Sequence, residues 1–96
     1  MQSFKKKIVS LVSNGIEPLE EGMRNFKHNI LDVELLAFDR AKECTMCEFY
    51  VDEPISFLKV KDKNIPELSE KMCDICGCTL SYKTRQSIEK CSKWQE

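Results

Sequence analysis

The first fourteen residues carry apolar side chains at the spacing of an α-helix. Phe4, Ile8 and Leu11 recur every three or four positions, and basic residues occupy the other faces. Gly15 can end this helix, because glycine adopts the left-handed conformation at low cost. The pattern predicts a short amphipathic helix over residues 3–14.

Two further helices are predicted before the first cysteine. Pro18 followed by acidic residues is typical of a helix start, and the apolar pattern resumes over residues 30–43. In the latter helix Leu31, Leu35 and Phe38 share one face, and the stripe is widened by Val33, Leu36, Ala37 and Ala41. Asp32 is the expected N-cap, and the helix should run directly into Cys44.

The second half of the chain has the alternating and aromatic runs of short strands. Residues 49–51 and 57–60 predict a hairpin with its turn at Pro54, and residues 79–82 predict a third strand. Residues 67–71 are polar and should form an exposed connection. The expected fold is therefore α+β: N-terminal amphipathic helices (1–43, a helical arm) followed by a small zinc-ribbon-like β module (44–96).

Length and composition bear on what stabilises the chain. Its 96 residues suit one modest domain, and the apolar residues bunch before position 60, so the cysteine-rich end needs another source of stability. We expect no secretory signal and no run of ~20 apolar residues that would span a bilayer. A reducing, cytosolic setting favours metal binding by paired cysteines, and a secreted three-disulfide scaffold is the alternative.

All six cysteines lie between positions 44 and 91, and the predicted metal ligands are Cys44, Cys47, Cys73, Cys76, Cys78 and Cys91. Two Cys-x-x-Cys pairs can each turn both sulfurs toward one ion, and Gly77 suits such a turn. The two pairs, Cys44 with Cys47 and Cys73 with Cys76, form the natural tetrahedral site. Cys78 and Cys91 then remain as buried thiols, as substitutes for one of the four, or as part of a second shared site. We expect one zinc, with an iron–sulfur cluster as the rival.

Catalysis and nucleic-acid binding are less favoured. A redox Cys-x-x-Cys pair expects a βαβ setting, and a catalytic zinc needs an open coordination position that no His or carboxylate set here supplies, so we expect no enzyme. The lone His28 is expected to be structural rather than a ligand. Residues 71–96 carry five basic and three acidic side chains, a surplus of +2 that a zinc with four thiolates cancels. Trp94 is expected to pack over the metal site rather than on a base.

The order of these motifs resembles a family: Cys44-x-x-Cys47, Cys73-x-x-Cys76-Gly77-Cys78, Lys83-Thr84-Arg85, Cys91 and Lys93-Trp94. It is similar to small cysteine-rich, zinc-ribbon-like zinc-binding proteins of tailed bacteriophages and prophages, a group of unknown function. The resemblance covers the second half of the chain and, more weakly, the helix that carries Arg40. Ser92 stands where the group usually has proline. The resemblance implies that all six cysteines act together, and it implies no activity.

The sequence therefore predicts a non-enzymatic, zinc-stabilised protein-binding or assembly module, a virion component or adaptor of a bacteriophage. Its place would be the host cytoplasm or the virion. The alternative is a nucleic-acid-binding or transcription-regulatory zinc protein. The residues expected to contact a protein partner are Phe4, Ile8, Leu11 and Leu35.

Overall fold

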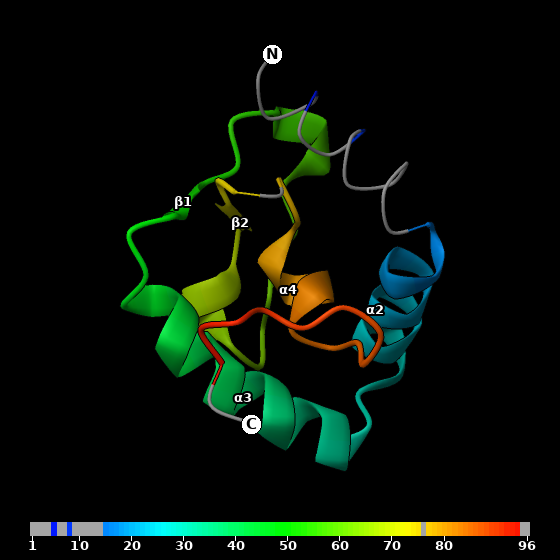
Figure 1. Cartoon of the computed structure of the whole chain (residues 1–96). Coiled ribbons are helices and arrows are strands. Elements are labelled where there is room, and N and C mark those ends of the chain that lie inside the picture. Colours follow the sequence, from blue (N-terminus) through cyan, green and yellow to red (C-terminus); the bar gives the residue numbers. More distant parts are fainter. Residues whose placement is uncertain (1–4, 6–7, 9–14, 76, 95–96) are drawn as a thin grey trace.

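The computed structural model describes residues 5, 8, 15–75 and 77–94 and shows helices beside a small two-stranded sheet (Figure 1). The expected α+β class is confirmed at this level. Most of the helix predicted over 3–14, including Phe4 and Leu11, lies outside the described residues, and so does Cys76. Lys5 and Ile8 are helical.

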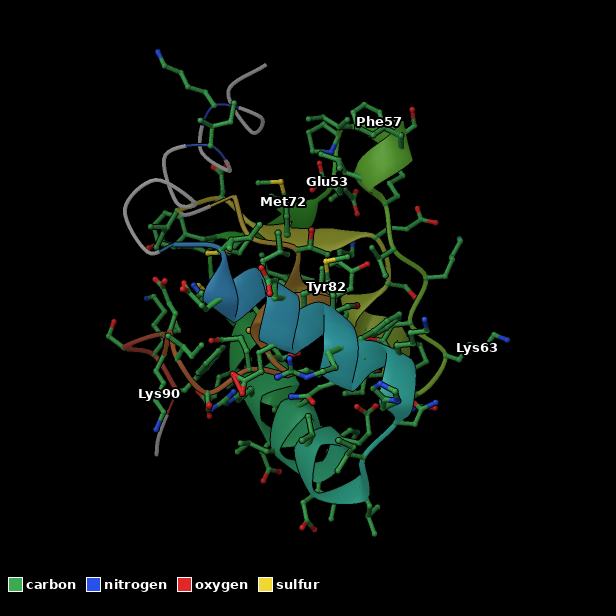
Figure 2. The ribbon with its side chains drawn as sticks, turned by 90° about the vertical axis from the view of Figure 1, so that its right-hand side faces the viewer. Glu53, Phe57, Lys63, Met72, Tyr82 and Lys90 are labelled. Carbon is green, nitrogen blue, oxygen red and sulfur yellow. The ribbon has the colours of Figure 1, made fainter. Side chains whose placement is uncertain are left out.

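Helix α2 (Glu17–His28) begins as the sequence predicted, with Pro18 and two acidic side chains in its first turn. It ends at Asn29, whose backbone is left-handed (φ 53°) and whose N–H bonds to Asn25 O. Phe26 packs edge-on against Tyr82 with ring centroids 5.5 Å apart. Figure 2 shows α2 lying over Tyr82, so this helix covers the centre of the molecule.

Helix α3 (Leu31–Thr45) runs into the first cysteine pair, as predicted. Two other expectations were wrong. The N-cap is Ile30, and Asp32 lies inside the first turn, where its charge still complements the positive helix end. The apolar stripe is also divided, because Ala37 and Ala41 are buried whereas the larger Leu31, Leu35 and Phe38 are exposed.

The predicted hairpin is wrong. Strand β1 (Tyr50–Asp52) pairs antiparallel with β2 (Lys71–Cys73), from a segment expected to be an exposed connection. The residues expected to form the second strand instead include the 3₁₀ helix η1 (Ser56–Leu58), whose Phe57 is 81% exposed. Met72 of β2 is buried, whereas Phe57 of the predicted second strand is exposed. Burial, rather than β-propensity, therefore decides which segment pairs with β1.

Residues 79–82 also differ from expectation. Thr79 makes an isolated bridge with Met72, and a short helix α4 (Leu80–Lys83) follows. Leu80, Ser81, Thr84 and Arg85 are all buried, and their spacing is helical rather than alternating. The helix thus buries Ser81, a polar side chain that an alternating strand would place on its outer face.

The core is small. Its buried apolar side chains come from α3, from the 3₁₀ helix η2 (Pro66–Leu68) with the residue before it, and from α4: they are Ala37, Ala41, Ile65, Leu68 and Leu80. Cys44, Tyr50 and Cys73 pack against this cluster. The alanines allow the neighbouring segments to approach α3 closely.

Arg85 forms the centre of a buried ionic network. It is 1% exposed. Its Nε and Nη2 donate to the two carboxylate oxygens of Glu34 at 2.6 and 2.8 Å, and its Nη1 and Nη2 donate to those of Asp62 at 2.8 and 3.1 Å. Nη1 also donates to Ser81 O, and the guanidinium lies over the Phe26 ring. One side chain therefore joins α2, α3, the loop before η2 and α4.

We predict that Gly22→Ala destabilises the fold. A Cβ at Gly22 would lie 2.2 Å from Tyr82 O and 2.8 Å from its carbonyl carbon, so α2 would have to move off α4. Overpacking of this kind costs about 1–3 kcal/mol, although alanine is intrinsically better in a helix. Urea unfolding measures the loss. The exposed neighbour Met23→Ala is the control, and an unchanged or raised midpoint for Gly22→Ala would contradict the close contact.

We predict a pH-dependent contribution from Glu34. Hydrogen bonding to Arg85 lowers the pKa of Glu34, although burial opposes this. A lowered folded-state pKa means that the contribution is present above the unfolded value of 4.5 and is lost as pH falls through the folded value.

The measurement is the difference in free energy of unfolding between wild type and Glu34→Gln across acidic pH. This difference should be constant from neutral pH to about pH 5 and then shrink. Any protonation of cysteine ligands affects both proteins and cancels. A difference that grows on acidification would contradict the prediction.

Candidate metal centre

The first cysteine pair sits at the end of α3. Cys44 is half-buried in the last turn, and Cys47 follows in a tight turn in which Cys47 N–H donates to Cys44 O at 3.0 Å. The Phe49 N–H donates to Cys47 Sγ at 3.5 Å. Backbone N–H groups aimed at sulfur stabilise a thiolate, which is the form that binds metal.

The second cysteine segment is also a turn. Cys73 ends β2, and Gly77 N–H returns to Cys73 O at 2.7 Å. Gly77 is left-handed (φ +74°), a conformation that a residue with a side chain adopts at a cost. Cys73 N–H donates to Cys78 O at 3.0 Å, which keeps the turn closed.

Cysteines from three separate segments line one hollow beside the core. They are Cys44, Cys47, Cys73 and Cys91. Phe49, Tyr50, Leu80 and Trp94 form its apolar wall, and Glu43, Lys83 and Lys93 lie at its edge. Cys78 is half-buried but does not line this hollow.

Several of the cysteines that line the hollow carry no disulfide. Cys44, Cys47 and Cys91 are free thiols. Within residues 15–75 and 77–94, with Lys5 and Ile8, no group of three or more His, Cys, Asp or Glu side chains could hold a metal ion as it stands. Binding zinc would require the sulfurs to move inward to about 2.3 Å from the ion.

Two observations describe the environment of Cys44. Burial raises the pKa of its thiol, the nearby Trp94 indole lowers it in part, and the neighbouring Cys91, Cys73 and Cys47 raise it. Trp94 Nε1 is buried and makes no hydrogen bond of ordinary geometry. The Trp94 indole and Cys44 line the same hollow.

These residues fit a thiolate-bound metal by their chemistry. Four cysteines are the donor set of a closed structural zinc site, and a buried N–H without a partner suits a charged sulfur. Zinc with four thiolates carries two negative charges, and Lys83 and Lys93 lie beside the hollow. Four cysteines satisfy an iron–sulfur cluster equally well.

Other candidate residues lie elsewhere. His28 is exposed at the end of α2. Arg85, one of the cations that a nucleic-acid site would use, is buried in its ionic network and cannot reach a phosphate. Sequence reasoning missed both buried arginines, Arg40 and Arg85. The only signal was their presence in the motifs that carry the family resemblance.

No family model, curated protein or solved structure matches the chain. None of the helices in the described residues is long and apolar enough to cross a membrane.

Proposed function

We propose that this chain is a non-enzymatic, zinc-stabilised protein-binding or assembly module. The supporting observation is the two-sided character of α3. Its inner face leads into Cys44 and the cysteine-lined hollow, whereas its outer face carries Leu31, Leu35 and Phe38, which are 70%, 59% and 47% exposed. Zinc would fix the end of the helix that presents this outer face.

The outer face has the properties of a docking surface. Residues 31, 35 and 38 are one helical turn apart and form a continuous stripe. Exposed apolar patches on small domains mark interaction sites more often than chance. Asp32 and Asp39 are exposed along one edge of the stripe. Asp39 pairs with Lys42, whose ammonium also lies over the Phe38 ring. The proposed occupant is a protein surface with an apolar centre and a basic residue opposite Asp32.

Other sequence expectations fit this proposal. Ile8 is 45% exposed, whereas Phe4 and Leu11 lie outside the described residues. The resemblance to bacteriophage proteins supports a role as a virion component or adaptor, in the virion or the host cytoplasm. The nucleic-acid alternative is less favoured, because Arg85 is buried and cannot contact a phosphate.

We predict one zinc per chain and loss of the fold on its removal. Structural zinc sites contribute on the order of 10 kcal/mol, comparable to the whole stability of a small domain. Elemental analysis and native mass spectrometry measure the metal, and circular dichroism follows unfolding by a strong chelator. Added zinc should restore the fold. Visible absorption with iron and sulfide would identify the cluster instead, and a metal-free protein unaffected by chelator would refute the proposal.

We predict that Leu35→Asp weakens partner binding at least tenfold, because burial of a leucine contributes about 1.5–3 kcal/mol and a charge in its place opposes docking. Photo-crosslinkers at positions 35 and 88 first identify the partner by mass spectrometry. Its affinity for the purified full chain is then measured.

Ile88→Asp is the matched control, since Ile88 is 57% exposed and lies outside α3. Both variants should keep wild-type zinc content. Equal affinity for the two variants would contradict the proposed surface. Crosslinks from position 35 only to a second copy of this chain would replace the proposed partner with a dimer.

A further inference from the structure

Arg40 fixes the C-terminal segment against α3. This side chain is 2% exposed and lies one helical turn before Cys44 on the same face. Its Nη1 donates to Thr84 O at 3.1 Å and to Gln86 O at 2.7 Å. Its guanidinium carbon lies 4.3 Å from the centroid of the Trp94 ring. Figure 1 shows the segment after α4 passing α2 and returning to the C-terminal end of α3.

The segment is also braced internally. Gln86 Oε1 accepts hydrogen bonds from the backbone N–H groups of Ile88 at 3.0 Å and Glu89 at 2.7 Å. The backbone N–H of Trp94 donates to Cys91 O at 3.1 Å, which closes a turn over residues 91–94. Both Cys91 and Trp94 line the hollow. The contacts of Arg40 and this turn therefore place the Cys91 thiol and the Trp94 indole beside the other cysteines of the hollow.

Trp94 supplies an observation that is independent of the thiols. The indole is 7% exposed, and its N–H is buried without a hydrogen-bond partner. A buried donor left unpaired costs free energy, so native proteins rarely keep one without a reason. Trp94 and Cys44 line the same hollow, and a thiolate accepts such a hydrogen bond well. Movement of Cys44 onto a metal ion would give this donor its partner.

We infer that residues 91–94 complete the metal site: Cys91 supplies the fourth thiolate beside Cys44, Cys47 and Cys73, and the Trp94 indole N–H donates to the Cys44 thiolate. This inference rests on the proposed zinc site. These four thiolates would fill a tetrahedral zinc. Cys78 does not line the hollow, and Cys76, which lies outside the described residues, is the rival for the place of Cys91. Trp94 acts as a positioning residue, in the way that outer-shell partners orient metal ligands.

The test is cobalt titration of the metal-free full chain, because thiolate–cobalt charge-transfer absorption reports both affinity and the number of sulfur ligands. Cys91→Ser should lose about one quarter of that absorption, since three of four thiolates remain. Its affinity should fall by more than the ~10- to 100-fold typical of losing an outer-shell partner. Cys76→Ser and Cys78→Ser, as matched controls, should bind cobalt like the wild type.

Trp94→Phe keeps the apolar ring but removes the N–H. It should keep the wild-type absorption intensity and stoichiometry, shift the energy of the charge-transfer band, and bind cobalt about 10-fold more weakly. Trp94 is the only tryptophan, so its fluorescence in the wild type should change with one equivalent of zinc. An unshifted band and unchanged affinity would overturn the role of the indole.

The outcomes separate this inference from the proposed function. A wild-type chain that binds no cobalt or zinc refutes both. A wild type that binds one ion, with normal binding by Cys91→Ser and lost binding by Cys76→Ser, refutes the inference and leaves the zinc module standing. Lost binding by Cys78→Ser would also overturn the four-ligand set.

Discussion

The arrangement of this small protein depends on the buried guanidinium of Arg85. Its partners come from segments far apart in the sequence, Glu34 in α3 and Asp62 before η2, and both carboxylates are further satisfied. Asp62 accepts from Ile65 N–H and the Ser81 hydroxyl, and Glu34 accepts from Asn64. Removing one member of such a buried set leaves an uncompensated charge, which costs about 3–5 kcal/mol. That is a large part of the stability of a domain this size, so the fold cannot easily tolerate the loss of a single partner.

The inner face of α3 suits close packing. Ala37 and Ala41 pack in one cluster with Ile65, Leu68 and Leu80, which brings α3 close to η2 and α4. Larger side chains on that face would separate α3 from η2 and α4. Leu31, Leu35 and Phe38 lie on the outer face of the helix, where they are exposed.

Sequence reasoning succeeded where the signal is local. Pro18 with its acidic neighbours marked α2, and the periodicity of residues 30–43 marked α3. It failed where burial is decided at a distance. The pattern assigns large apolar residues to the core, but Arg85 pairs with Glu34 across 51 positions, and no local pattern encodes that separation. The strand prediction for residues 79–82 fails for the same reason. Leu80 and Ser81 are both buried although they are adjacent, and the next buried residues, Thr84 and Arg85, follow one helical turn later.

The cysteines show a similar limit. Spacing singled out the Cys-x-x-Cys pairs, but the approach of Cys91 depends on Arg40 holding the chain after α4. The two buried arginines, Arg85 and Arg40, lie in different surroundings. Around Arg85, carboxylates, a hydroxyl and backbone groups already satisfy one another. Around Arg40, the contacts lead to Trp94, whose indole N–H is buried without a hydrogen-bond partner, and to the turn that brings Cys91 into the hollow. Native folds rarely bury an unpaired donor, which is why the proposed metal site is placed beside Trp94.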